Sequence, residues 1–217
     1  EKDIILSKFR NRNQKYIMQI IKDFIFIIPA RKNSKGIKNK NLIKINNKKL
    51  VEYTFDILKN IPKNRKYVLT DSKSIKLIAK KYQINTSYKR PKILSKDTTE
   101  LVMNLIHFDN FIGNNVNFKN YIILQPTSPL RLKKDIFGAI KKFNKDNCDS
   151  LVSVSKSLEH PNDTISIRNK QLVFFNKKKS TLRQSYNESY FINGAIYILK
   201  KKNLDKRKLI STNKTSI

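Results

Sequence analysis

The strongest apolar segment of the chain is Phe24–Ile28, in which every side chain is aromatic or β-branched. An apolar run without polar alternation is typical of a strand that is buried on both faces, as in a parallel sheet covered by helices. The run stops at Pro29, because proline cannot donate to a strand ladder. Shorter runs predict further strands at Tyr67–Leu69, Tyr121–Leu124, Leu151–Val154, Leu172–Phe175 and Phe191–Leu199.

Segments with a helical spacing of apolar residues separate these strands. Leu50–Leu58 is one of them, and Ser72 is a suitable N-cap for another that runs to Lys81. We expect two more helices, from Thr98 or Thr99 to about Phe111 and over Lys133–Phe143. Strands that alternate with helices predict an α/β fold with a mostly parallel sheet.

Composition argues against two classes of protein. The 217 residues include one cysteine, Cys148, so no disulfide can form within the chain and we expect a reducing compartment, the cytoplasm. No apolar run is long enough to span a bilayer, and charges throughout residues 1–24 do not fit a secretory signal peptide. We therefore expect neither a membrane protein nor a disulfide-rich secreted protein.

The formal net charge of +31 raises the possibility of nucleic-acid binding. However, the excess comes from 38 Lys against nine Arg, and the lysines are scattered along the chain. Proteins that read nucleic acids rely more on arginine, whose guanidinium makes bidentate contacts. A lysine-rich background of compositional origin is the better interpretation, and we expect no nucleic-acid partner.

A basic loop follows the first predicted strand. Eight Lys and Arg residues and no acidic residue occur between Arg31 and Val51. In open α/β sheets ligands bind beyond the carboxyl ends of the strands, so these cations would surround an anion placed there. Gly36 would allow a tight turn and a close approach of backbone amides to a phosphate. The alternative is a solvated loop in a protein that is rich in lysine.

The sequence LQPTSPLR at residues 124–131 follows the third predicted strand of the core. Its two prolines restrict the backbone, so Gln125, Thr127, Ser128 and Arg131 would be presented in a rigid arrangement. The alternative is an ordinary strand-to-helix connection in which Ser128 caps the next helix.

A third polar segment consists of Arg183 and the run YFINGAIYI at residues 190–198. Asn193 and Gly194 interrupt an otherwise apolar strand, which indicates a bulge or a close approach of the backbone to a ligand. Asn-Gly is also the strongest signal for a hairpin turn, so both interpretations stay open.

Taken together, IPARKNSKGIKNKNL at residues 28–42, LQPTSPLR at 124–131 and RQSYNESYFINGAIYI at 183–198 resemble the acylneuraminate cytidylyltransferases. This family, also called the CMP-sialic acid synthetases, includes enzymes that activate legionaminic and pseudaminic acids. The resemblance implies a nucleotide-diphospho-sugar transferase-like, Rossmann-like α/β fold over residues 23–217. It also implies a small extended dimerisation element at about residues 155–190, and hence a homodimer.

The activity that this resemblance implies is the transfer of CMP from CTP to a sialic-type nonulosonic acid, with release of pyrophosphate. The anomeric hydroxyl of the sugar acid would attack the α-phosphate, and positioning and charge neutralisation would supply most of the catalysis. The CMP-sugar product implies a place in lipopolysaccharide or capsule biosynthesis.

Residue roles follow from position within the family's motifs. Arg31, Lys40 and Gln125 match the catalytic positions, and Ser34 joins Arg31 and Lys40 in holding the triphosphate, a task that suits charge-assisted hydrogen bonds. The resemblance assigns the other contacts to the nucleotide (Asn41, Arg90 and Ser128) and to the sugar acid (Gln125, Arg183, Asn193 and Tyr197). Asp71 follows a strand that ends at the same edge, and it fits a functional role and a helix cap equally well.

The family binds catalytic Mg²⁺ with an Asp-x-Asp run soon after the segment that resembles Lys214–Ile217. Asp205 is the only acidic residue between Asn193 and Ile217, and Mg²⁺ requires carboxylates together with phosphate oxygens. We therefore expect Mg²⁺ as a cofactor with its ligands beyond residue 217. We also expect residues 1–22 to be an N-terminal extension of the domain. We hypothesise that Met18 is the natural start and that residues 1–17 lie upstream of it, which N-terminal mapping of the expressed protein would test.

Two alternatives to this function stay open. One is a catalytically impaired homologue that binds nucleotide or dimerises but lacks the metal motif. The other is a Kdo cytidylyltransferase, a family with a related opening motif but without this pairing of QPTSPLR and NGAIYI.

Overall fold

The computed structural model describes residues 15, 17–32, 36–96, 98–175, 186–206, 209–210 and 214–217. The chain divides into two compact units, and we call residues 1–152 with 194–217 the core unit and residues 153–193 the hairpin unit. The two boundaries lie within strands β6 (Ser150–Lys156) and β9 (Tyr190–Lys200). Each unit is described separately below.

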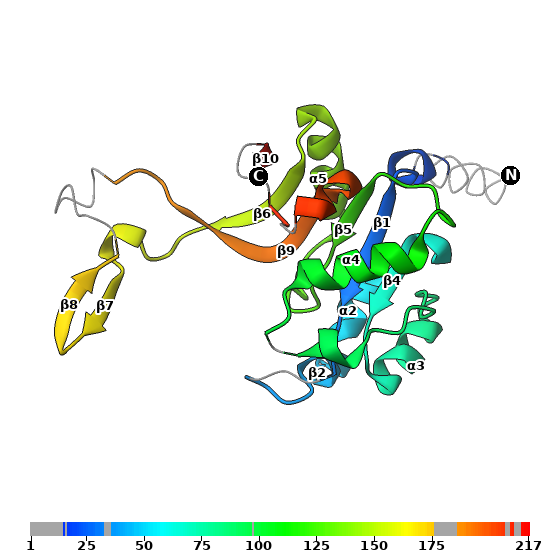
Figure 1. Cartoon of the computed structure of the whole chain (residues 1–217), viewed down its shortest axis with the longest axis horizontal. Coiled ribbons are helices and arrows are strands. Elements are labelled where there is room, and N and C mark those ends of the chain that lie inside the picture. Colours follow the sequence, from blue (N-terminus) through cyan, green and yellow to red (C-terminus); the bar gives the residue numbers. More distant parts are fainter. Residues whose placement is uncertain are drawn as a thin grey trace, which may run out of the picture. The chain divides into compact units, whose positions relative to one another are not determined.

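A six-stranded sheet with the order β10-β6-β9-β5-β1-β4 forms the centre of the core unit (Figure 1). Strand β1 pairs in parallel with β4 and β5, β10 pairs in parallel with β6, and β9 runs antiparallel to β5. The sheet is therefore mostly parallel, as the alternation of elements predicted. The further bounds are β1 (Phe24–Pro29), β4 (Lys66–Leu69), β5 (Asn120–Ile123) and β10 (Thr215–Ser216).

Helices cover both faces of this sheet, which explains the unbroken apolar run of β1. Phe24, Phe26 and Ile28 belong to one buried cluster, and Ile25 and Ile27 to a second on the opposite face. The first cluster is completed by α2 (Leu50–Ile57), α3 (Lys73–Lys81) and α5 (Lys133–Asp146), and the second by α4 (Leu101–Ile112), which lies across the sheet in Figure 1.

Short elements complete the core unit. They are η1 (Lys40–Leu42), β2 (Lys44–Ile45), β3 (Lys48–Lys49), η2 (Lys63–Arg65), η3 (Lys92–Ser95) and η6 (Lys201–Lys206). The hairpin unit contains η4 (Pro161–Asp163), β7 (Ile165–Arg168) and β8 (Gln171–Phe174). The turn between β7 and β8 has positive φ at Asn169 and Lys170, as expected for a two-residue type I′ turn.

One local expectation was wrong, and two of the alternatives left open are excluded. Helix α4 begins at Leu101 and not at Thr98 or Thr99, because the amide of Thr99 donates to Lys96 O and its hydroxyl to Ile93 O, which continues the preceding turn. Ser128 does not cap α5, whose N-cap is Leu132, with the amide of Leu132 bonded to the Asp135 carboxylate at 2.9 Å.

The second excluded alternative concerns Asn193 and Gly194. Strand β9 continues through both residues, so they do not form a hairpin turn. Gly194 has φ of +74°, a left-handed conformation inside a strand that glycine adopts without steric penalty.

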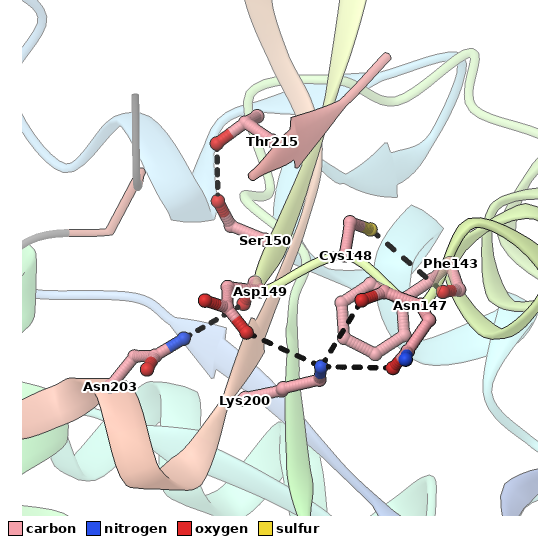
Figure 2. A network of polar contacts seen from close by, with 8 residues as sticks. All are labelled: Phe143, Asn147, Cys148, Asp149, Ser150, Lys200, Asn203 and Thr215. Atoms are coloured by element: carbon pink, nitrogen blue, oxygen red, sulfur yellow. Dashed lines mark hydrogen bonds and ion pairs between the residues drawn. The ribbon is translucent and has the colours of Figure 1, made fainter. Parts of the chain in front are cut away.

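Lys200, at the end of β9, ties together segments that are distant in sequence. Figure 2 shows its ammonium donating to the backbone and side-chain oxygens of Asn147 and to the Asp149 carboxylate. In the same network, the Ser150 hydroxyl lies 2.6 Å from the hydroxyl of Thr215. These contacts join the C-terminal end of α5 to strands β6, β9 and β10.

No helix in the described part of the chain combines the length and the apolar character that crossing a bilayer requires.

Candidate functional site

A cavity of about 290 Å³ lies beyond the carboxyl ends of β1 and β5. We call it the strand-end cavity. It lies where ligands bind in open α/β sheets, and its size is near the lower end of the usual range for ligand pockets, about 300–1,000 Å³. Six residues singled out from the sequence line it together: Arg31, Lys40, Asn41, Arg90, Gln125 and Thr127.

Hydrogen bonds to backbone groups hold the start of the basic loop at the edge of the cavity. The Asn41 side chain is buried and donates to Arg31 O at 3.0 Å, and the amide of Lys32 donates to the Asp71 carboxylate at 2.7 Å. Asn41 therefore fixes the start of the loop besides lining the cavity. Asp71, which follows the end of β4, also fixes the start of the loop. The N-cap of α3 is instead Ser72, which accepts a hydrogen bond from the Ile75 amide.

Gly36 is not a position of this loop that requires glycine. Gly36 has no positive φ, and a Cβ added to it would meet nothing within 4 Å. Asn39 takes the left-handed conformation instead, with φ of 54°, directly before Lys40. The side chain of asparagine tolerates this conformation better than most other side chains.

Arg90 is the most buried cation of the strand-end cavity. It is 9% exposed, and its Nε and Nη2 both donate to Leu94 O. Burial lowers the pKa of Arg90, the nearby Asp71 carboxylate opposes this effect, and the positive charge of Arg31 adds to it. The three charges therefore lie close enough to influence one another, and the cavity wall carries a fixed positive charge that suits an anionic ligand.

Gln125 borders the cavity where β5 ends, next to β9. Its side-chain Oε1 would lie 3.2 Å from a Cβ on Gly194, and the hydroxyl of Tyr197 would lie 3.8 Å from the same point. Burial raises the pKa of Tyr197, so the phenol stays protonated near neutral pH. The bare backbone of Gly194 therefore allows Gln125 and Tyr197 to share a small space.

The other residues singled out from the sequence lie elsewhere. Ser128 does not line the strand-end cavity, and Arg131 is buried behind it, donating to backbone carbonyls. Asn193 belongs to the hairpin unit, where it bonds the hydroxyls of Ser153 and Ser155. Ser34 and Arg183 lie outside the described residues.

Comparison with known proteins decides the family. The model of the family described as "Cytidylyltransferase" matches residues 25–215, nearly the whole chain. The chain belongs to this cytidylyltransferase family. Its apolar strands, basic loop and QPTSPLR segment all fall within the matched region.

Several curated proteins are similar to this cytidylyltransferase. The N-acylneuraminate cytidylyltransferase of Streptococcus agalactiae serotype V is 28% identical over 196 residues, which are 88% of this chain but 46% of that protein. The CMP-N,N'-diacetyllegionaminic acid synthase of Legionella pneumophila is 31% identical over 84% of this chain and 80% of its own length. The post-translational flagellin modification protein B of Campylobacter coli is 31% identical over 82% and 78%. The chain thus spans about half of the first relative and most of the other two.

Solved structures share the fold of this cytidylyltransferase. A CMP:2-keto-3-deoxy-manno-octonic acid synthetase, complexed with CTP, matches with a TM-score of 0.61 and 15% identity over 85% of this chain and 77% of its own. A 4-diphosphocytidyl-2C-methyl-D-erythritol synthase from Anaerococcus prevotii matches with a TM-score of 0.57 and 15% identity over 88% and 80%. At this level of identity the likeness concerns the fold, which is the α/β nucleotidyltransferase fold expected from the resemblance.

Four lining residues of the cytidylyltransferase were not singled out from its sequence: Lys96, Thr99, Leu101 and Asn104. They come from the turn before α4 and from its first part. Asn104 is fully buried, its Nδ2 lies 3.4 Å from Glu100 O, and its Oδ1 is the one buried side-chain oxygen without a hydrogen-bond partner among the described residues. An amide on the apolar side of a predicted helix was the available signal, because buried polar groups are rare without a reason.

The described residues of the cytidylyltransferase do not fit a divalent metal ion. They contain no group of three or more His, Cys, Asp or Glu side chains that could hold one. The described lining of the strand-end cavity contains four cations, Arg31, Lys40, Arg90 and Lys96, and no carboxylate. This arrangement can bind and orient a polyanion, and a Mg²⁺ ion would need ligands from other residues or from the bound phosphates.

Proposed function

We propose that this protein transfers CMP from CTP to a sialic-type nonulosonic acid. One observation carries the proposal: Arg31, Lys40, Arg90 and Gln125 line a single cavity at the strand ends of a chain that belongs to the cytidylyltransferase family. Arginine and lysine are the usual partners of phosphate oxygens. The most similar relatives described above are named for N-acylneuraminate and N,N'-diacetyllegionaminic acid, which supports a nonulosonic acid as acceptor.

The proposed reaction is a single displacement at phosphorus. The anomeric oxygen of the sugar acid forms a bond to the α-phosphorus of CTP, the bond from that phosphorus to the bridging oxygen breaks, and pyrophosphate and the hydroxyl proton are released. Arg31, Lys40 and Ser34 hold the triphosphate and stabilise the charge that develops on pyrophosphate. Asn41, Arg90 and Ser128 contact the nucleotide.

The sugar acid binds on the side of Gln125 in this proposal. Gln125 can donate to and accept from hydroxyl groups, since a primary amide has both kinds of atom. Arg183 meets the sugar carboxylate, and Asn193 and Tyr197 border the sugar. No step is assigned to Mg²⁺, whose ligands we expect outside the described residues.

A homodimer built through the hairpin unit is part of the proposal. Strands β7 and β8 expose apolar side chains to an extent that is unusual for a surface ribbon, and such patches mark interaction sites. Ile167 is 76% exposed and Phe175 is 67% exposed. We expect Ile167→Glu to convert a dimer into a monomer in light scattering, and a wild type that is monomeric at micromolar concentration would contradict this part.

The cytoplasm is the proposed location, because the one cysteine, Cys148, is a free buried thiol. The CMP-sugar product would serve lipopolysaccharide or capsule biosynthesis.

The deciding experiment is pyrophosphate release from CTP with a panel of sialic, legionaminic, pseudaminic and Kdo acids and added Mg²⁺. We expect turnover with at least one nine-carbon acid. Lys40→Met should reduce it strongly, whereas Lys80→Met on the exposed side of α3 should not. Failure of every acid to react, with either CTP or UTP as donor, would refute the proposal.

A second candidate is a homologue that binds CTP without turning it over. The described lining of the strand-end cavity contains no carboxylate to hold the Mg²⁺ that the resemblance implies, and this observation favours the second candidate. Saturable binding of CTP in calorimetry without pyrophosphate release would support this candidate.

A further inference from the structure

Arg131 is a buried arginine outside the strand-end cavity, and the function described above leaves it without a task. It is 6% exposed and follows the second proline of the QPTSPLR segment by two residues. Burial lowers its pKa to about 10, with the nearby Asp135 carboxylate acting in the opposite direction. The guanidinium therefore stays charged at neutral pH, and oxygen atoms of the protein accept hydrogen bonds from it.

These oxygens come from three separate parts of the fold. Nη1 donates to Gln125 O, where β5 ends, and to Ala195 O in β9. Nη2 donates to the hydroxyl of Thr54 in α2 at 2.9 Å, and Thr54 is itself fully buried. One planar group thus joins the helix that follows the basic loop to Gln125, just after the end of β5, and to strand β9 beside Gly194.

The spacing of those two strands decides where the Gln125 side chain lies. Ala195 directly follows Gly194, and Oε1 of Gln125 lies 3.2 Å from the point at which Gly194 would carry a Cβ atom. A carbonyl on each side of this contact is bonded to the same nitrogen, Nη1 of Arg131. A shift of either strand would therefore break a hydrogen bond of Arg131 and move Gln125 relative to the cavity.

We propose that Arg131 is a positioning residue that holds Gln125 in register with Gly194, and that Thr54 supports it by fixing the plane of the guanidinium. This inference rests on the proposed CMP transfer, in which Gln125 lies at the junction of nucleotide and sugar acid. Arginine is required because its fork reaches three acceptors at fixed angles, whereas the ammonium of lysine is a compact group on a flexible stem.

Thr54→Val tests the proposal without touching the strand-end cavity. It keeps the shape of the side chain and removes the acceptor of Nη2. We expect kcat to fall about tenfold while KM for CTP stays within about twofold, because misplaced groups reduce turnover more than ground-state binding. Thr54→Ser retains the oxygen and should restore kcat.

Arg131→Lys should lower kcat further than Thr54→Val does. The double variant that combines Thr54→Val with Arg131→Lys should have a kcat no lower than Arg131→Lys alone, since the effects of residues that act through one another are not additive.

Lys66→Met serves as the matched structural control. Lys66 is also a buried cation that donates to backbone carbonyls, of Leu58, Lys59 and Tyr82, but it does not line the cavity. We expect this variant to melt at a lower temperature than the wild type and to have an unchanged kcat at temperatures at which it is folded. A Thr54→Val enzyme with unchanged kcat, or effects of Thr54→Val and Arg131→Lys that simply add, would overturn the positioning role.

Amide hydrogen exchange supplies a readout that needs no turnover. Peptides that cover residues 124–132 and 193–199 should exchange faster in Thr54→Val and Arg131→Lys than in the wild type and Thr54→Ser. Unchanged exchange in both variants overturns the positioning role. If the wild type transfers CMP to no acid but the exchange differences are found, the proposed function fails while the clamp on Gln125 stands.

Discussion

The side-chain oxygen Oε1 of Gln125 lies 3.2 Å from the point at which Gly194 would carry a Cβ atom. Gly194 also has φ of +74°, which other residues adopt only with strain. Two independent constraints, clearance and backbone conformation, therefore require glycine at this position of β9.

Gly194→Ala should consequently damage the proposed site. The new methyl group would push the Gln125 side chain aside by a few tenths of an ångström, and we expect turnover to fall about tenfold because it is sensitive to small misplacements. The left-handed backbone adds a stability cost of about 1–2 kcal/mol. Pyrophosphate release and thermal melting measure the two effects separately.

Gly138→Ala is the control for this variant. Gly138 lies inside α5, and a Cβ there would meet nothing within 4 Å. Alanine in a helix interior is favoured over glycine by about 0.5–1 kcal/mol, so we expect a more stable protein with unchanged turnover. Equal activity of Gly194→Ala and Gly138→Ala would show that Gln125 tolerates the methyl group.

Lys66 begins strand β4 with a side chain that is fully buried. Its ammonium donates to Leu58 O at 2.9 Å and to Tyr82 O at 3.3 Å, at the C-terminal ends of α2 and α3. Lys66→Met removes these hydrogen bonds, although Leu58 O still accepts from the Ile61 amide, and we expect the free energy of unfolding to fall by about 1–3 kcal/mol. Burial of the charge lowers the pKa of Lys66, which works against the fold and keeps the expected loss from being larger.

Chemical denaturation of Lys66→Met beside Lys80→Met checks this expectation. Lys80 is exposed in the last turn of α3, where such substitutions change stability by less than about 0.5 kcal/mol. Indistinguishable denaturation midpoints for the two variants would mean that the buried hydrogen bonds only balance the cost of burying the charge.

Tyr88 should make the stability depend on alkaline pH. It is 1% exposed, its hydroxyl lies 3.1 Å from His107 Nδ1, and burial raises its pKa to about 12, with Arg90 acting in the opposite direction. Between pH 10 and pH 12 the unfolded phenol loses its proton while the folded phenol keeps it, so the folded state binds more protons and stability falls as pH rises.

The two-unit shift in the pKa of Tyr88 corresponds to a loss of up to about 2–3 kcal/mol across this window. Tyr88→Phe removes the group, so the difference in unfolding free energy between wild type and variant should shrink by that amount from pH 9 to pH 12. Other tyrosines and the lysines titrate in both proteins and cancel in the comparison. A constant difference over the whole range would contradict the assigned cause.

The sequence predicted backbone elements well and the partners of buried polar groups poorly. Strand β1 could be located because burial on both faces leaves an unbroken apolar run, and the cavity edge followed from where such runs end. Lys66 could not be recognised as buried, since lysine is normally exposed and its partners lie at two helix ends that are assembled only by the fold. The same holds for Arg131, which we expected to be presented in a rigid arrangement with Gln125. It instead donates to two backbone carbonyls and to the hydroxyl of Thr54.

Asp71 provides a test of how the basic loop is held. The sequence allowed a helix cap or a functional role, and in the structure its carboxylate accepts from the Lys32 amide while Ser72 caps α3. We expect Asp71→Ala to weaken CTP binding about fivefold in calorimetry, as loss of one hydrogen bond of about 1 kcal/mol implies.

Asp71→Asn should bind CTP at least as tightly as the wild type, because the amide oxygen still accepts from Lys32 and a negative charge near Arg90 is gone. Ser72→Ala should lower the melting temperature without changing CTP binding, since it removes only the cap. If Asp71→Ala behaved like Ser72→Ala, losing stability but no affinity, the carboxylate would support the helix and the loop would not depend on it.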